Sequence, residues 1–191
     1  MTEIFTDHMD VEQKLDSLPL RFGDTMWLVG GFTGKQARIM SDRYGVSLTV
    51  FEPQTDLAKA LANNLPQVCV YPFGLGAVTG NKPMAGKGTD ACSFYTHIGG
   101  EATVGECVDV AAFLSVNDAP ALAMLNCEGS EIDILDRLHE TKLIKQFLRL
   151  LIQFHPQVVG EATCERVFRQ LQETHTIIWR YWWGWIYAEA L

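Results

Sequence analysis

The sequence predicts a doubly wound α/β fold with a mostly parallel sheet, and two observations lead to this prediction. Short apolar runs that are typical of buried strands alternate with longer segments of helical periodicity. The first two of these runs end at a glycine-rich turn and at a carboxylate, and ligands of open α/β sheets bind at such strand ends. We therefore expect one sheet with helices on both faces and a ligand site at its carboxyl edge.

Five apolar runs, bounded by glycine, proline or polar residues, predict the core strands. They cover residues 25–29, 47–51, 68–71, 121–125 and 147–154. Segments with apolar residues at helical spacing predict four helices. These cover residues 35–44, 56–64, 130–139 and 161–173. Thr55 is expected to cap the second of these helices, because its hydroxyl can accept a backbone N–H of the first turn.

The remaining segments predict a long loop and a C-terminal hairpin. Residues 74–105 are rich in glycine and poor in apolar runs, so we expect a loop with at most short strands, followed by regular structure at 106–110. Two alternating segments, 174–181 and 185–190, predict an antiparallel hairpin. The whole chain 1–191 is expected to form one domain. Its parts are an N-terminal extension (1–24), a cofactor-binding core (25–160) and a C-terminal helix and hairpin (161–191).

Composition argues against several classes of protein. The net charge of −8 and the pI near 5.0 oppose binding to duplex nucleic acid, which relies on clustered lysine and arginine. The five cysteines are scattered, with no C-x-x-C pair, so neither a disulfide framework nor a metal site is expected. The acidic start of the chain does not resemble a signal peptide, and no apolar run is long enough to span a bilayer. We expect a cytoplasmic monomer or homodimer without a membrane partner.

A glycine turn and a carboxylate follow the first two predicted strands. Gly30, Gly31 and Gly34 would let the backbone approach a ligand, and the next helix offers unpaired N–H groups at its start. Glu52 follows the second strand directly, where its carboxylate can accept hydrogen bonds from both hydroxyls of a ribose. Each signal alone is weak, because glycine turns and strand-end glutamates are common.

Spacing excludes two phosphate-binding motifs at this turn. A Walker loop needs four residues between its first glycine and Gly-Lys, whereas Gly30 and Gly34-Lys35 enclose three, and Gln36 stands in place of serine or threonine. The dinucleotide pattern G-x-G-x-x-G also fails, because its middle glycine is out of register. An adenosine ligand without a pyrophosphate is the interpretation that remains.

The order of four motifs resembles the FkbM family of S-adenosylmethionine-dependent methyltransferases. The motifs are V-G-G-F-T-G at 29–34, F-E-P at 51–53, L-N-C-E-G-S-E at 125–131 and F-H at 154–155. The family pattern runs roughly D-V-G-A-N-x-G, F-E-P, I-D-V-E-G-A-E-x-x-L and E-F-H. The resemblance covers about residues 25–160, and it implies a Rossmann-like methyltransferase fold.

The resemblance also implies S-adenosylmethionine as cofactor and gives roles to individual residues. Gly30 and Gly34 should approach the methionine part of the cofactor, and Glu52 should hold its ribose. Phe73 and Gly74 should lie near the adenine. The full set expected to bind the cofactor is Gly30, Gly31, Gly34, Glu52, Phe73, Gly74 and Asn126.

Three positions depart from the family pattern, and each loses polarity or charge. Leu28 and Asn126 stand where the family has aspartate, and Phe32 stands where it has asparagine. Leu28 and Phe32 should weaken contacts to the amino and carboxylate groups of the cofactor. An amide at Asn126 holds a divalent cation less well than a carboxylate and is no base, so we expect transfer without a metal.

Methyl transfer to a hydroxyl benefits from a general base, and three residues are candidates. His155 follows a strand and has a near-neutral ordinary pKa, although it is equally suited to bond a neighbouring carbonyl. Glu128 can take a proton or cap the helix that starts after Gly129. Asp90 lies on the long loop. The preferred function, which the resemblance implies, is O-methylation of a sugar or small-metabolite hydroxyl.

Two other functions, and the role of the C-terminal aromatic residues, remain to be considered. The losses at Leu28, Phe32 and Asn126 favour a catalytically degenerate methyltransferase fold that binds a ligand or a partner protein, as the first alternative. An NAD-linked or nucleotide-sugar enzyme is disfavoured by the glycine spacing. The C-terminal aromatic residues predict core packing, or alternatively a platform for a sugar, a base or a partner. They are Trp179, Tyr181, Trp182, Trp183, Trp185 and Tyr187.

Overall fold

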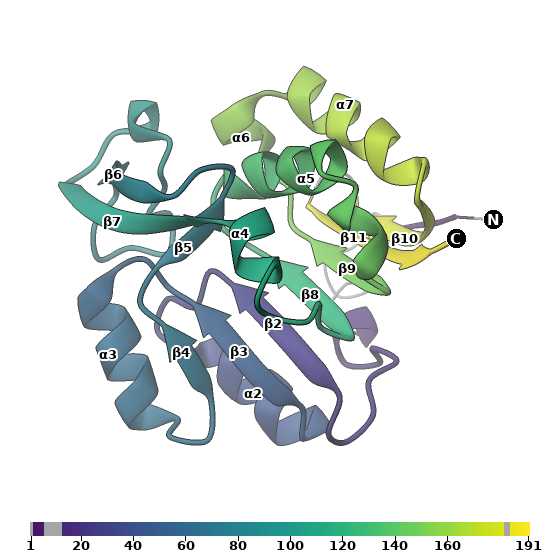
Figure 1. The fold of residues 1–191 in the computed structure, drawn as a ribbon, viewed down its shortest axis with the longest axis horizontal. Coiled ribbons are helices and arrows are strands. Elements are labelled where there is room, and N and C mark those ends of the chain that lie inside the picture. The colour runs from purple at the N-terminus through teal and green to yellow at the C-terminus, as the bar shows by residue number, and fades with distance from the viewer. Residues whose placement is uncertain (1, 6–12, 182–183) are drawn as a thin grey trace.

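A computed structural model describes residues 2–5, 13–181 and 184–191, and these form a twisted eight-stranded sheet with helices on both faces. Figure 1 shows a second, three-stranded sheet beside one end of the first. The main sheet has the order β1-β10-β11-β9-β8-β2-β3-β4. Its strands are β1 (Glu3–Phe5), β2 (Thr25–Val29), β3 (Ser47–Phe51), β4 (Cys69–Tyr71), β8 (Leu122–Leu125), β9 (Arg149–Ile152), β10 (His175–Tyr181) and β11 (Trp185–Ala190).

The centre of the main sheet is parallel, as the sequence predicts. Strands β4, β3, β2, β8 and β9 run in one direction, and Leu28 of β2 lies level with Val50 and Met124 of its neighbours. The chain winds outward from β2 to β4 and then returns to β8 on the other side of β2. The strand order therefore reverses between β2 and β8, and such switch points are where open α/β sheets bind ligands.

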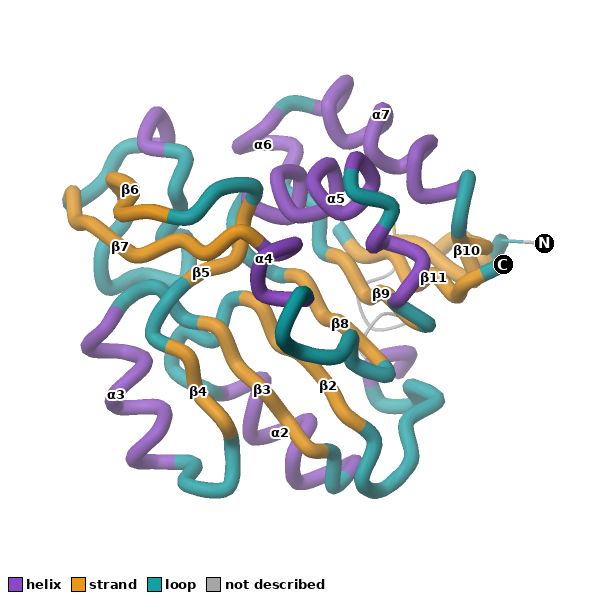
Figure 2. Tube along the Cα trace, viewed as in Figure 1, coloured by secondary structure: helices purple, strands orange, loops and turns teal. Residues whose placement is uncertain are grey.

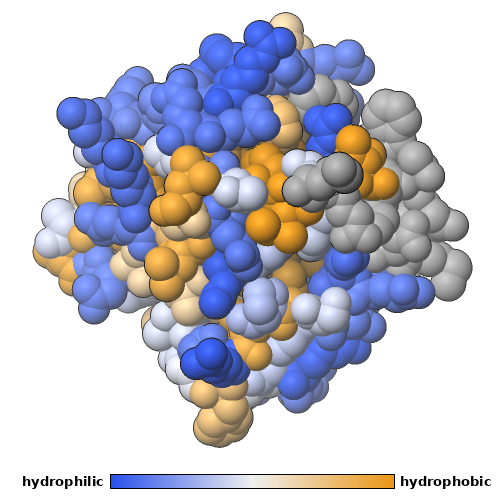
Figure 3. All heavy atoms as spheres, turned by 90° about the vertical axis from the view of Figure 1, so that its right-hand side faces the viewer, coloured by the Kyte–Doolittle hydropathy of each residue, from blue (hydrophilic) through white to orange (hydrophobic). Residues whose placement is uncertain are grey.

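Helices cover the two faces of this sheet in separate layers (Figure 2). They are α2 (Lys35–Tyr44), α3 (Thr55–Asn64), α4 (Val110–Leu114), α5 (Ser130–Glu140), α6 (Pro156–Val159) and α7 (Glu161–Gln172). Because side chains alternate along a strand, Met26 and Leu28 pack into one apolar cluster with α2, whereas Trp27 and Val29 pack into a second cluster with α5 and α7. The outer surface of α7 is mostly hydrophilic (Figure 3).

The predicted C-terminal hairpin is confirmed, and it extends the main sheet. Strand β11 pairs antiparallel with both β10 and β9, while the N-terminal strand β1 adds a parallel edge beside β10. Trp179, Trp185 and Tyr187 are buried in the apolar cluster that also contains α2, so for these three the packing interpretation fits. Trp182 and Trp183 lie outside the described residues.

The prediction for residues 74–105 as a loop is wrong in part. This segment contains β5 (Gly74–Gly76), β6 (Gly80–Ala85) and the start of β7 (Ala102–Asp109), which together form the second sheet. Its strands carry glycine and Pro83, and much of β6 and β7 is solvent-exposed, so they lack the apolar runs that mark buried strands. Long-range pairing between β6 and β7 forms them instead.

Smaller corrections concern the ends of elements. Thr55 is the first residue of α3 and Gln54 is its N-cap, and neither supplies a side-chain cap. Strand β9 covers Arg149–Ile152 and is therefore shorter than the predicted run 147–154, and a short 3-10 helix (Leu143–Gln146) precedes it. The regular structure expected at 106–110 is the end of β7 and the first residue of α4.

Candidate functional site

A cavity of about 340 Å³ lies at the carboxyl ends of β2, β3 and β8, within the size range of small-molecule sites. Seven of the predicted site residues form part of its wall. They are Gly30, Gly31, Glu52, Gly74, Asp90, Asn126 and Glu128. The wall does not include Gly34, Phe73 or His155. The cavity also coincides with the reversal of strand order, so topology and geometry point to the same place.

Gly30 allows two strand ends to meet beneath the cavity. Its φ is +96°, and a Cβ built on it would lie 1.8 Å from the carbonyl oxygen of Asn126. The Gly30 N–H donates to Phe51 O at 3.0 Å, and the Asn126 N–H donates to Val29 O at 3.0 Å. A side chain at this position would push β2 and β8 apart, so glycine keeps the floor of the cavity closed.

Phe32 adopts a backbone conformation that non-glycine residues seldom adopt. Its φ is +43°, and its N–H donates a hydrogen bond to Glu52 Oε2 at 2.7 Å. The family pattern has asparagine at this position, a residue that tolerates left-handed φ better than phenylalanine does. The carboxylate of Glu52 therefore helps to hold a strained turn.

Glu52 is 3% exposed, and each of its oxygens accepts one backbone N–H. Gln54 N donates to Oε1 at 2.8 Å, as Phe32 N does to Oε2. Burial raises the pKa of Glu52, and the hydrogen bonds from Gln54, Phe32 and Gly31 lower it in part. Each carboxylate oxygen has a further lone pair, so the group can accept two hydroxyls from a ligand as well.

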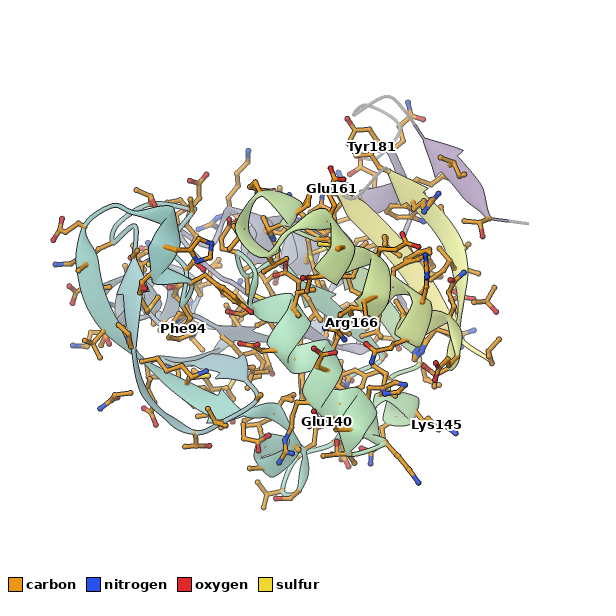
Figure 4. All side chains as sticks on the ribbon, turned by 90° about the horizontal axis from the view of Figure 1, so that it is seen from above. Phe94, Glu140, Lys145, Glu161, Arg166 and Tyr181 are labelled. Atoms are coloured by element: carbon orange, nitrogen blue, oxygen red, sulfur yellow. The ribbon has the colours of Figure 1, made fainter. Side chains whose placement is uncertain are left out.

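Phe94 is an aromatic residue of the cavity wall that the sequence did not single out. A Cβ at Gly74 would lie 2.7 Å from the Phe94 ring, so the ring covers Gly74 closely. Phe73 instead packs into the core, tilted against Tyr71 and Phe51 with ring centroids 5.1 and 5.9 Å away. In Figure 4, Phe94 lies on the small-sheet side of the molecule.

Asn126 carries a buried amide oxygen that makes no hydrogen bond within the described part of the chain. It belongs to the cavity wall directly after β8. An unsatisfied buried carbonyl costs about 1 to 3 kcal/mol, so a ligand that donates an N–H or O–H here would be favoured. Sequence alone identified the position but not this open acceptor.

His155 is buried between two glutamates. Its Nδ1 lies 2.9 Å from Glu131 Oε1 and its Nε2 lies 2.9 Å from Glu128 Oε1. Burial lowers the pKa of His155, but the hydrogen bonds and negative charges of Glu128 and Glu131 raise it more, to about 9. At neutral pH both ring nitrogens therefore donate, and the imidazolium has no lone pair to accept a proton.

Glu131 holds His155 in this arrangement. The sequence predicted no role for it, although it lies in the motif at 125–131. Its side chain is fully buried and accepts the backbone N–H groups of Gly129 at 3.0 Å and His155 at 3.1 Å. Glutamates three residues apart at a helix start, followed by a strand-end histidine, are the signal that could have revealed it. The three side chains form a Glu128–His155–Glu131 triad.

The segment between β6 and β7 makes hydrogen bonds to Glu128 of this triad and to helices α5 and α6 beside it. Ser93 Oγ donates to Glu128 O at 2.5 Å, and Tyr95 OH donates to Asp133 Oδ1 at 3.2 Å. His97 Nε2 lies 2.8 Å from Val158 O. The second sheet therefore closes one side of the cavity, and Asp90 enters the wall from the same segment.

No helix within 2–5, 13–181 and 184–191 is long and apolar enough to cross a membrane. The same residues contain no group of three or more histidine, cysteine, aspartate or glutamate side chains placed to hold a metal ion.

The chain is similar in structure to known methyltransferases. An rRNA methylase from Streptococcus thermophilus matches with a TM-score of 0.56 and 10% identity, over 98% of both chains. A provisionally assigned methyltransferase from Streptococcus mutans, solved in complex with SAH, matches with a TM-score of 0.57 and 11% identity, over 98% of this chain and 99% of that one. A chain of the fibrillarin/Nop5p complex matches with a TM-score of 0.61 and 12% identity, over 96% of this chain and 79% of that one.

No protein-family model matches the sequence, and no curated protein matches it significantly. At such low identities the structural matches establish the fold, which is the Rossmann-like fold of methyltransferases. The resemblance to the FkbM family stays a prediction. The expectation that duplex nucleic acid is no partner also stays a prediction.

Proposed function

We propose that this chain is a methyltransferase that takes its methyl group from S-adenosylmethionine bound in the 340 Å³ cavity. The observation that carries the proposal is the buried Glu52 carboxylate at the end of β3, beside the close approach of Gly30 to β8. This arrangement suits a ribose on one side and an extended amino-acid chain on the other. The likeness to structures of methyltransferases, one of them with SAH, supports it.

In this proposal, different wall residues contact the ribose, the adenine and the methionine part of the ligand. Glu52 accepts the ribose hydroxyls, and Gly74 with Phe94 faces the adenine. The backbone of Gly30 and Gly31 approaches the methionine part. The open oxygen of Asn126 accepts an N–H of the ligand, so the departure from aspartate here leaves a usable contact.

The other two departures bear differently on the proposal. Leu28 is 1% exposed and packs with α2, away from the wall, so its loss of charge removes no contact that the cavity would offer. Phe32 does line the cavity, and its half-buried ring can cover the ligand without donating to it. These two losses therefore do not require a degenerate site.

Bound S-adenosylmethionine supplies an activated methyl group on a sulfonium, and the chain has to align an acceptor with it and exclude water. We assign the role of general base, which takes the proton of a hydroxyl acceptor, to Glu128 in the cavity wall. Asp90 is the second candidate. His155 fits a different role from the predicted base, because both of its nitrogens already hold glutamates. It orients the Glu128 carboxylate through the contact of its Nε2 with Glu128 Oε1.

The preferred acceptor is a hydroxyl of a sugar or small metabolite. RNA is the second candidate, because two of the similar structures bear names that concern rRNA methylation or a fibrillarin complex. The net charge of −8 opposes that candidate, since it repels a phosphate backbone. A ligand-binding module without turnover is the outcome if the donor binds and no acceptor is ever methylated.

Calorimetry tests the proposal directly. We expect S-adenosylmethionine and S-adenosylhomocysteine to bind and NAD not to bind. Glu52→Gln should weaken binding of both by about 1 to 3 kcal/mol, the usual loss for hydrogen bonds to a charged group. Glu106→Gln, at an exposed position on β7, is the matched control and should bind normally. No heat at millimolar ligand with folded protein would overturn the proposal, and binding of NAD would favour a dehydrogenase.

A further inference from the structure

A second cavity adjoins the first, with a volume of about 540 Å³. Its wall consists mainly of the segment between β6 and β7 and the start of α6. The residues are Gly86, Thr89, Ala91, His97, Gly99, Gly100, Glu128, Gln157 and Val158. Thr89 and Glu128 belong to the walls of both cavities. The two spaces therefore meet at Thr89 and Glu128.

We propose that the second cavity receives the methyl acceptor, and that this acceptor is an uncharged or cationic small molecule that donates a hydroxyl or amine hydrogen to Glu128. This inference rests on the proposed function, because it takes the first cavity as the donor site. It adds the place of the acceptor and the charge that the acceptor carries.

The charge of the wall sets the chemical class. Among the described residues that form it, Glu128 is the one acidic side chain, and lysine and arginine are absent. The neighbouring Lys87 is exposed and pairs with Glu101, with Nζ and Oε1 3.4 Å apart. Phosphates and carboxylates are held in proteins by arginine and lysine, so an anionic acceptor would be repelled here without compensation.

Glu128 is fixed at both its backbone and its side chain. Its φ is +51°, its carbonyl accepts Ser93 Oγ, and its Oε1 accepts from His155 Nε2. Glu131 holds the far side of the imidazolium. His155 and Glu131 are thus positioning residues, since they direct the Glu128 carboxylate without touching either cavity.

The reaction balances with this carboxylate as proton acceptor. The acceptor oxygen forms a bond to the methyl carbon while the carbon–sulfur bond breaks and its electron pair stays on sulfur. The hydroxyl proton passes to Glu128. With an amine acceptor the same carboxylate takes a proton of the ammonium product.

Labelled methyl transfer tests the proposal with a matched panel of probes. Glucose, glucosamine, glucose 6-phosphate, glucuronate and a short single-stranded RNA are each incubated with the protein and tritiated S-adenosylmethionine. A wider set of neutral and cationic metabolites is paired in the same way with phosphorylated or carboxylated forms. We expect incorporation at least about tenfold higher in the neutral or cationic member of a pair, because the wall offers no counter-charge to an anion.

Ala91→Trp fills the second cavity, and Ala62→Trp, on the exposed face of α3, is the control. We expect the first variant to lose at least about tenfold in transfer while its affinity for S-adenosylmethionine stays unchanged, because only acceptor placement is blocked. The control should keep both. Unchanged transfer in Ala91→Trp, preferred methylation of an anion or RNA, or no methylation of any panel member by donor-loaded protein would each overturn the proposal. Failure to bind the donor would instead refute the proposed function.

Discussion

Gly30→Ala measures how much stability is lost when a side chain is added at the floor of the cavity. The new Cβ would lie 1.8 Å from Asn126 O and 2.9 Å from Asn126 C, and both are backbone atoms that cannot turn aside. A left-handed φ costs an alanine about 1 to 2 kcal/mol, and forcing extra volume into a packed site costs about 1 to 3 kcal/mol more. We therefore expect a loss of about 2 to 5 kcal/mol in the free energy of unfolding.

Gly23→Ala is the matched control for this prediction. Gly23 has a φ of +83°, close to the +96° of Gly30, but no atom lies within 4 Å of its added Cβ. Its substitution isolates the backbone term, so we expect a loss of only about 1 to 2 kcal/mol. Urea unfolding followed by circular dichroism compares the two variants. Equal losses would refute the close approach of β2 to β8, and with it the shape of the cavity floor.

Three further predictions concern the turn, the triad and the metal. The free energy of unfolding of Phe32→Asn should be about 1 kcal/mol larger than that of Phe32→Leu, because asparagine tolerates the left-handed turn. Equal free energies of unfolding in urea would show that Phe32 is not strained. His155 has a raised folded pKa of about 9, so its stabilising effect is complete below the unfolded pKa near 6.5 and is lost as pH rises through 9. Wild-type unfolding free energy should thus fall by at most about 3 kcal/mol between these pH values, and His155→Gln should lack this fall; parallel curves would place the titration elsewhere. Transfer to a non-phosphorylated acceptor should survive EDTA, and loss of activity that magnesium restores would show a metal-dependent reaction.

The parallel centre of the sheet could be predicted because its strands are buried on both faces. Runs such as 25–29 and 121–125 are apolar apart from Thr25, and glycine or polar residues mark their ends. Strands β6 and β7 gave no such signal. They lie in a small, partly exposed sheet, and their pairing joins residues on opposite sides of the 86–101 segment.

The candidate site was predictable where a residue follows a strand directly, and less so elsewhere. Gly30 and Glu52 were identified because the carboxyl ends of parallel strands meet at one edge, and Asn126 was identified through the resemblance to the FkbM pattern. Phe73 packs against the core and lies outside the cavity wall, since an aromatic residue after a strand can turn into the core or out of it. The partners of His155 are Glu131 of α5 and Glu128 in the turn before it, and sequence spacing does not reveal which nitrogen meets which carboxylate.

A crystal structure of the protein with S-adenosylhomocysteine tests the central claim most directly. The proposal predicts both ribose hydroxyls within about 2.5 to 3.0 Å of the Glu52 oxygens, the ordinary range of O–H···O hydrogen bonds. It also predicts a ligand N–H on the open oxygen of Asn126. Density for the ligand at another place, or a ligand in this cavity whose ribose does not contact Glu52, would contradict it.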